Sequence, residues 1–420
     1  MKIKTILAIA FFITAANIST VHAANNDAAV TLDDCYRAAL KQSETVATQQ
    51  ETIHQAEEHY RQALAVMLPN LGLGYSLQKL DSLPDQDTGK AYLSLPLFRG
   101  FRDFATLKQN QSVITSQKQA YRWAALQLYG DVSQAFFLAI SLEQDLAILQ
   151  KESGLYDQRV KDLSARVAIG RSRRTDVLSV QAARAALAGQ IEQVKAQLMA
   201  AREMLSFLTG RPSDIKLSDQ AGQDGELGDV GRYLKMLEQR PDIGAAKANV
   251  EAAEKNVEIA NGAMLPSADL AGNAYLNQPH GPGLYDKWDA QISVTLPVFT
   301  GWYNTSKKAE AGSLLKQSRI ALQLVKRQAE ENLRTVYEQV ASDREQIARF
   351  GEAARLAEQN YKAVAGDYEL GLVSNLDVLT ALTSYQDASR SLNRAVYALK
   401  SDRARLTSIT AGIDVPEGGE

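Results

Sequence analysis

Two long stretches without proline do most to limit what this chain can fold into. No proline occurs between Pro96 and Pro212, and none occurs between Pro297 and Pro416. Both stretches are rich in Ala, Leu, Gln, Glu, Lys and Arg, which favour a continuous helix, whereas proline interrupts one. A helix over residues 101–167 would be on the order of 100 Å long at 1.5 Å per residue. We therefore expect elongated helical hairpins instead of a compact globule.

A nearly identical hexapeptide opens each stretch, LPLFRG at 95–100 and LPVFTG at 296–301. At this offset of 201 residues the alignment continues without insertion to GRSRRTDVL and GLVSNLDVL. Upstream, the tripeptide MLP recurs at an offset of 197 residues, so a four-residue difference lies between the two motifs, where we expect a loop. The chain thus consists of two structural repeats, 24–210 and 236–412, with an inter-repeat surface segment at 211–235 and a short tail at 413–420.

Each repeat is predicted to contain a helix, two strands, a very long helix, a turn and a returning helix. Alternation of apolar and polar residues indicates the strands, because it puts one kind of side chain on each face of a sheet. The four strands are expected at about 70–79, 91–98, 267–277 and 288–299. Polar, turn-rich segments at 81–90 and 277–287 are expected to be the loops of the two strand pairs. The helical hairpins are expected to turn near 170–176 and 371–377.

The strands have the length and pattern of a transmembrane β-barrel, although a surface sheet alternates in the same way. Four strands cannot close a barrel, since about eight is the smallest useful number. Open edges in lipid leave backbone groups unpaired, so the chain must share its barrel with other copies. Three copies would supply twelve strands. Trp288, with Tyr285 nearby, and Trp302 with Tyr303 lie where an aromatic girdle is expected, unless they simply pack.

The remaining composition limits location and chemistry. Residues 1–23 have the pattern of a secretory signal peptide, and their apolar run is shorter than the ~20 residues that a membrane anchor needs. The single cysteine, Cys35, excludes a disulfide framework and lies on a predicted helix, and the net charge of −3 indicates no nucleic-acid surface. His54 and His59 are poorly spaced for a metal, and no phosphate-binding loop or nucleophile–base pair is recognisable. We expect neither a cofactor nor an enzyme activity.

Along residues 30–412 the chain resembles the TolC-like outer membrane efflux protein family. The resemblance rests on the duplicated halves, the two LPxFxG motifs, and the Gly-x5-Asp-Val-Leu pattern that follows each at a fixed distance. It implies a mainly α fold with a transmembrane β part: a homotrimer whose twelve-stranded outer-membrane barrel continues into a long periplasmic α-helical barrel. It also implies a passive exit duct that docks with a periplasmic adaptor (membrane fusion protein) and an inner-membrane pump.

The same resemblance implies that the two turns form a constricted periplasmic gate. Asp377 would contribute to a ring of carboxylates, with Asp176 as its equivalent in the first repeat. Some members carry a second carboxylate three residues on, where this chain has Thr380. In the family an arginine of the second turn can latch the gate, but the second turn of this chain contains no arginine. We hypothesise that an ionic latch instead joins Asp377, of the same or a neighbouring protomer, to three arginines of the first turn: Arg171, Arg173 and Arg174. The alternative is that these arginines are solvated charges, since exposed ion pairs contribute little.

Local physical chemistry suggests structural roles for the same positions. Gly170 and Gly371 suit the left-handed residue that commonly ends a helix, and both aspartates could cap the returning helices. At the two strand–helix junctions, proline can bend the end of the strand and glycine permits the change to helix. The junction residues are Pro96, Phe98, Gly100, Pro297, Phe299 and Gly301.

One alternative is a soluble periplasmic coiled-coil adaptor or scaffold. It would explain the hairpins and the signal peptide, but not four amphipathic strands at matching offsets in the two halves. Within the duct interpretation, small-molecule efflux and type I protein secretion both remain open, because the sequence does not identify the cargo.

Overall fold

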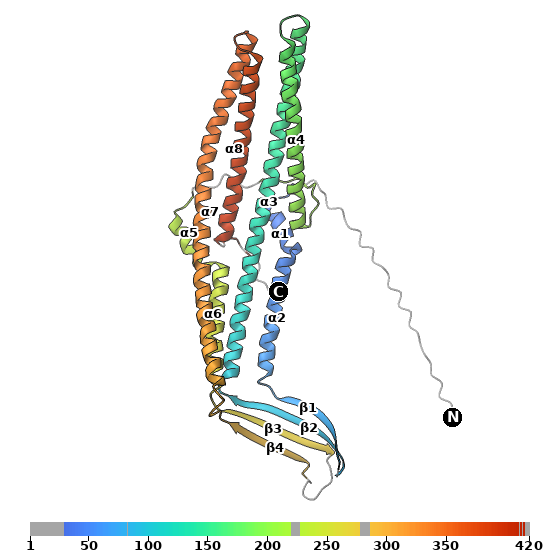
Figure 1. Ribbon diagram of the computed structural model, residues 1–420, viewed down its shortest axis with the longest axis vertical. Coiled ribbons are helices and arrows are strands. Elements are labelled where there is room, and N and C mark those ends of the chain that lie inside the picture. The colour runs from blue at the N-terminus through green and yellow to red at the C-terminus, as the bar shows by residue number, and fades with distance from the viewer. Residues whose placement is uncertain are drawn as a thin grey trace, which may run out of the picture.

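The computed structural model describes residues 29–81, 83–219, 227–277, 286–410, 412–413 and 415. The predicted signal peptide, 1–23, lies outside these residues. The molecule is elongated, with a bundle of long helices at one end and a curved four-stranded sheet at the other (Figure 1). The elements follow the predicted order, with short helices α1, α5 and η1 in addition: α1 (Leu32–Gln42), α2 (Glu44–Ala65), β1 (Asn70–Leu80), β2 (Leu83–Arg99), α3 (Arg102–Ala168), α4 (Arg174–Thr209), α5 (Val230–Met236), η1 (Leu237–Gln239), α6 (Pro241–Gly262), β3 (Ser267–Asn277), β4 (Trp288–Thr295), α7 (Tyr303–Glu369) and α8 (Asn375–Ile409).

The duplication is reproduced in the elements themselves. The long helices α3 and α7 both have 67 residues, and their ends differ by the predicted offset of 201 residues. Helices α2 and α6 have 22 residues each and differ by 197. The starts of β1 and β3 also differ by 197 residues, so the change of offset lies within the strand pairs, where a loop was expected.

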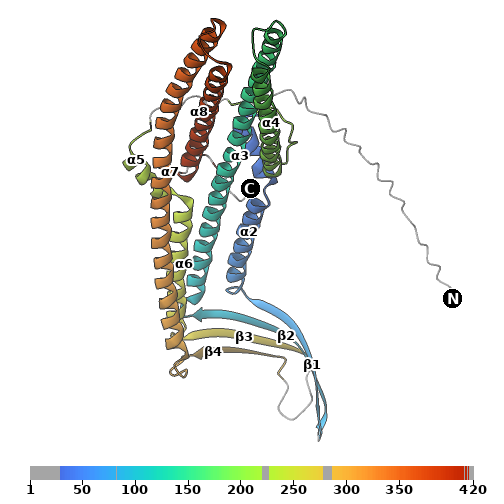
Figure 2. The ribbon, with the colours of Figure 1, turned by 45° about the horizontal axis from the view of Figure 1, so that its top comes forward.

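The strands form one antiparallel sheet in the order β1-β2-β3-β4. The register pairs Leu71 with Leu93 and Leu270 with Ile292, so the predicted apolar faces of all four strands lie on one side of the sheet. Most of the large apolar side chains on this face are exposed in the single chain; Leu73, for example, is 80% exposed. Figure 2 shows the sheet curving away below the helices with no helix on it. An apolar face of this extent indicates a membrane or partner surface.

Two strand boundaries were predicted wrongly. β2 begins at Leu83, so most of the polar segment 81–90 is strand instead of loop, because backbone pairing with β1 continues from Gln78 opposite Gln86 to Leu80 opposite Leu83. Such pairing does not depend on apolar side chains. β4 ends at Thr295 instead of 299, because its partner β3 starts at Ser267, opposite Thr295, and has no further residue to pair with. Of the other predicted loop, residues 278–285 lie outside the described residues.

The core lies between helices, and α3 is its centre. α3 packs against α2, α4, α6 and α8, whereas α7 packs mainly against α6 and α8, with a small contact to α5. Accordingly, α3 buries twenty of its residues and α7 buries seven. By length and composition, one window of α3 is apolar enough to cross a membrane, but 61% of that window is buried inside the structure. Burial in the bundle therefore accounts for the apolar character of this window.

Of the inter-repeat segment, residues 211–219 and 227–235 are described. The first of these parts is joined to the start of the described chain by a bridge between Val30 and Leu217. The second part contains most of α5, and η1 leads from α5 into α6. Cys35, on α1, is fully buried beside this region, and burial raises the pKa of its thiol to about 11. Cys35 is thus a core residue.

Candidate functional site at the helical-hairpin turns

The two long helices end in the same way. Gly170 and Gly371 both have left-handed backbones, with φ of 71° and 78°. After α3, the N–H of Gly170 donates to Val167 O and that of Arg171 to Arg166 O, at 3.0 and 2.8 Å. These two bonds form the motif in which glycine closes a helix by satisfying its last carbonyl groups. The chain can therefore reverse within a few residues at each hairpin turn.

Each returning helix begins with an aspartate in its first turn. The Asp377 carboxylate accepts hydrogen bonds from the backbone N–H and the hydroxyl of Ser374, at 2.8 and 2.6 Å. The bonds from the hydroxyl and the backbone N–H hold the pKa of Asp377 below its ordinary value. In the first turn, Asp176 accepts from Arg173 N and Ser172 Oγ, at 3.2 and 3.1 Å. Both aspartates make the local contact of a helix start, and Asp377 remains fully exposed.

The arginines of the first turn do not reach Asp377 within one chain. Arg173 lies with its Nε 3.8 Å from Asp176 Oδ2 and is 80% exposed. Among the described residues of this chain, no contact joins Arg171 or Arg174 to Asp377. The single chain in this conformation therefore contains no latch from these arginines to Asp377, and a latch between protomers stays a prediction. Thr380, at the place of a possible second carboxylate, donates its hydroxyl to Leu376 O within α8.

A different arginine, which the sequence did not single out, connects the two hairpins. The guanidinium of Arg159, on α3, stacks 3.8 Å from the ring centroid of Tyr368, on α7. Its Nε donates to Oδ1 of Asn375, the first residue of α8, at 3.1 Å. Burial lowers the pKa of Arg159, although an arginine remains charged. Arg159 therefore contacts both the outgoing and the returning helix of the second hairpin.

Asn375 completes this connection. It is 4% exposed, and its amide nitrogen lies 3.3 Å from the backbone oxygen of Asp176 and 3.4 Å from Ser179 Oγ. One buried side chain thus joins the start of α8 to the start of α4 and to Arg159. We call Arg159, Tyr368 and Asn375 the tip clasp.

The strand–helix junctions differ in how they are packed. Pro96 lies opposite Asp269, and the register shifts by one residue before Phe98, so a bulge accommodates the proline inside a central strand. Gly100 has φ of 61°, and a Cβ there would lie 2.3 Å from the carbonyl oxygen of Gly262 on α6. The left-handed backbone and the lack of space for a Cβ atom both require glycine at position 100. Pro297, Phe299 and Gly301 follow the end of β4 and are outside the sheet.

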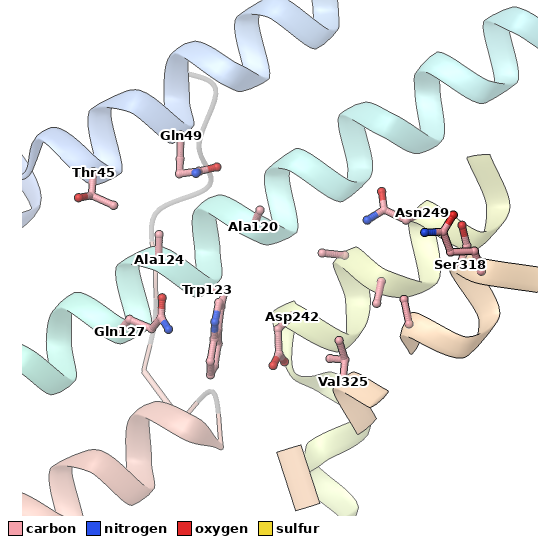
Figure 3. Close-up of a pocket in the computed structure, with 14 residues that line it drawn as sticks. Thr45, Gln49, Ala120, Trp123, Ala124, Gln127, Asp242, Asn249, Ser318 and Val325 are labelled. Carbon is pink, nitrogen blue, oxygen red and sulfur yellow. The ribbon is translucent and has the colours of Figure 1, made fainter. Parts of the chain in front are cut away.

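A hollow of about 790 Å³ lies along the helical layer, far from the turns. Figure 3 shows side chains from four helices around it: Thr45 and Gln49 on α2, Trp123 and Gln127 on α3, Asp242 and Asn249 on α6, and Ser318 and Val325 on α7. Asp242 is neutralised by Arg240, with Nη2 and Oδ2 2.6 Å apart. The remaining lining is apolar or uncharged. Among the described residues, no group of three or more His, Cys, Asp or Glu side chains could hold a metal ion.

Comparison with known proteins gives a family match in both halves of the chain. The family model described as outer membrane efflux protein matches residues 35–211 and again 233–412. Outer membrane efflux protein BepC of Brucella suis is 25% identical, over 77% of this chain and 74% of the relative. Outer membrane protein TolC of Vibrio cholerae is 23% identical, over 84% and 83%.

Two further matches concern secretion and fold. Alkaline protease secretion protein AprF of Pseudomonas aeruginosa is 23% identical, over 79% of this chain and 71% of AprF. Among solved structures, the outer membrane protein VceC of Vibrio cholerae superposes with a TM-score of 0.79 at 20% identity, covering 90% of this chain and 95% of VceC. The fold is therefore the same along nearly the whole length.

Proposed function

This chain belongs to the outer membrane efflux protein family, and on that premise we propose that it forms the exit duct of an efflux or type I secretion system. The duct lies in the outer membrane and extends into the periplasm. It conducts its cargo passively, because the family consists of channel proteins and not of enzymes. The family match also removes the alternative of a soluble periplasmic adaptor or scaffold.

The exposed apolar face of the sheet is the observation that carries the membrane part of this proposal. Residues paired across β1 to β4 put apolar side chains on one face and Asp289, Asn273 and other polar groups on the opposite face. In a closed barrel the apolar face contacts lipid and the polar face lines water. A four-stranded sheet has two open edges, so closure requires further copies, and three copies give twelve strands.

The unequal surroundings of α3 and α7 support the same assembly. These helices are equivalents in the two repeats, yet α3 packs against α6 and α8 of the other repeat in addition to α2 and α4 of its own, whereas α7 packs mainly against α6 and α8 of its own repeat. In a ring of repeats, α7 would receive α2 and α4 from the neighbouring copy, just as α3 receives α6 and α8 from its own chain. Each copy would then complete the next, and the ring closes with three copies.

The hairpin turns are the proposed periplasmic gate. They lie at the end of the molecule opposite the sheet (Figure 1), and fully exposed Asp377 would give a ring of three carboxylates in a trimer. The tip clasp holds the two hairpins of each chain together, so opening requires its release. Arg171, Arg173 and Arg174 are available for a contact between protomers.

The partners and cargo follow from the family at a coarser level. A passive duct needs an energy source elsewhere, so we infer an inner-membrane pump and a periplasmic adaptor that docks at the hairpin ends. BepC and TolC bear outer membrane or efflux names and AprF is named for alkaline protease secretion, so both small-molecule and protein cargo are compatible with the family.

Membrane fractionation and planar-bilayer recording test the proposal together. We expect the protein in the outer-membrane fraction, to be released by detergent and not by salt or osmotic shock. The purified protein should form discrete channels in a bilayer. Release by osmotic shock, together with a failure to conduct, would refute the duct.

A further inference from the structure

The two helical hairpins of one chain meet along α3 and α8, and part of this contact is charged and buried. Asp145, on α3, is fully buried, and its Oδ2 lies 2.8 Å from Arg394 and 3.5 Å from Arg390, both on α8. Asn393 donates to the other oxygen of Asp145 at 2.8 Å. A carboxylate buried to this degree is tolerated because it has two cations and an amide beside it.

A second buried carboxyl group lies two helical turns further along α3. Glu152 is 6% exposed and, seven residues from Asp145, is on the same face of the helix. From α8, Asp387 and Arg390 act on it electrostatically, the first unfavourably and the second favourably for its ionised form. Arg390 thus serves two carboxylates, and its Nε makes no hydrogen bond among the described residues. We call Asp145, Glu152, Asp387, Arg390 and Arg394 the α3–α8 joint.

Glu152 has neighbours that suit both of its protonation states. The hydroxyl of Tyr156 hydrogen-bonds to its carboxyl group. The side-chain amide of Gln386 lies beside it and can donate its NH2 to a carboxylate or, turned over, accept the proton of the acid through its oxygen. Neither state therefore leaves the carboxyl group without a partner.

Among the described residues of the other helices around Glu152, no cation acts on its carboxyl group. α4 faces this part of the core with apolar residues, among them Leu187 and Val194, and its Arg184 is paired with Asp157 at 2.7 Å. On α7, Glu358 is paired with Lys362 at 2.7 Å. The charge balance of the α3–α8 joint is therefore set by three carboxyl groups and two arginines. Ionised Glu152 gives a net charge of −1, and protonated Glu152 gives zero.

Three of these charges are not repeated in the other half of the chain. In the other repeat, the positions equivalent to Glu152, Asp387 and Arg390 are Ala353, Ala186 and Gly189. Burial raises the pKa of Glu152 to about 7, so the joint changes charge near neutral pH. An ordinary glutamate, with a pKa of 4.5, would already be ionised there.

We propose that Glu152 is a proton-binding site at the α3–α8 joint, and that loss of its proton loosens the contact between the two hairpins. The proposal rests on the proposed duct, because the hairpins must part when its periplasmic end opens. Packed hairpins hold the proton more tightly than parted ones, in which water reaches Glu152. Packing is therefore favoured at low pH, weakens as the pH rises from about 4.5 to about 7, and stays weaker above that range.

Two readouts on the purified full-length protein test this proposal. The first is an infrared titration of the protonated carboxyl band, which needs no channel activity. We expect a component that titrates near pH 7 in the wild type and is missing in Glu152→Gln. The second is open probability in a planar bilayer at pH 5.5 and pH 8. The wild type should open at least about tenfold more at pH 8, since one pKa unit corresponds to about tenfold, whereas Glu152→Gln should open to the same extent at both pH values, and no more than the wild type does at pH 5.5.

Two further variants sharpen the result. Asp387→Asn removes the opposing carboxylate, so the titration and the change in opening should both shift to lower pH. Glu358→Gln removes an exposed carboxylate from α7 and should alter neither readout. No component near pH 7 would overturn the proton site, and an unchanged pH response in Glu152→Gln would overturn its link to opening. Absence of channels at every pH would contradict the duct, while the infrared titration would still decide whether Glu152 holds the proton.

Discussion

Replacing Arg159 with alanine should shift the duct towards its open state. Arg159 makes a cation–π contact with Tyr368 at 3.8 Å and a hydrogen bond to Asn375 at 3.1 Å. A partly desolvated cation–π contact is worth about 1–2 kcal/mol, and a hydrogen bond from a charged group about 1.5–3 kcal/mol. Because opening need not break both contacts completely, we assume that it costs about 3 kcal/mol per chain. This corresponds to roughly a hundredfold change in the ratio of closed to open tip clasps.

Open probability in a planar bilayer measures this change directly. Arg159→Lys keeps the charge but loses the planar fork, so it should open to an intermediate extent. Arg184→Ala is a matched control, because Arg184 forms an ion pair with Asp157 on the same hairpin while both side chains are about half exposed. Exposed pairs contribute about 0–1 kcal/mol, so the control should behave nearly as the wild type. If Arg159→Ala opened no more than Arg184→Ala, the tip clasp would not hold the gate.

Three other outcomes follow from the structure. Gly72→Ala should lower the melting temperature of the assembly, because its Cβ would lie 2.3 Å from the Tyr92 ring, whereas Gly74→Ala, at 4.0 Å, should not; equal melting of the two variants would contradict this packing. Burial and the neighbouring Asp343 raise the pKa of Asp402 to about 6, so the α7–α8 contact should be most stable at low pH and weaken as the pH rises from about 3.8 to 6. Replacing both aspartates by the residues found at the equivalent positions of the first repeat, in the double variant Asp343→Leu with Asp402→Ala, should abolish the pH dependence of the melting temperature. A persisting pH dependence would refute the assignment. Cys35 should react with a maleimide only after unfolding, and rapid labelling of the native protein would contradict its burial.

Features that repeat or alternate along the chain were predictable. The offsets of 201 and 197 residues fixed the equivalent helices, since α3 and α7 start at equivalent residues and end at equivalent residues. The limits of β3 were also predicted correctly, because its alternation and its flanking turns coincide. Backbone pairing determines where β2 begins and where β4 ends. It depends on which residue of the neighbouring strand lies opposite, and the sequence of a single strand does not indicate this.

Contacts between the repeats were not predictable in the same way. Arg159 and Asn375 are separated by 216 residues, and no spacing within either turn indicates that they meet. The arginines that the sequence did indicate crowd a turn whose aspartate is already bonded locally. A comparison of equivalent positions could have helped, since Asn375 replaces the arginine found at position 174 of the first turn. A departure from the repeat pattern therefore indicates a contact between the hairpins that the shared pattern does not indicate.

Crosslinking between copies tests the central claim, a ring in which each chain completes the next. Within one chain, Ser116 on α3 hydrogen-bonds to Ala245 O on α6 at 3.2 Å. The equivalent residues are Gln317 on α7 and Thr48 on α2, which should meet only between neighbouring copies.

In a Cys35→Ser background, Thr48→Cys with Gln317→Cys should give covalent trimers on a denaturing gel when treated with a short bifunctional maleimide. Ser116→Cys with Ala245→Cys should crosslink within the chain and migrate as a monomer. Monomers alone from the first pair, under conditions in which the second pair reacts, would contradict the ring.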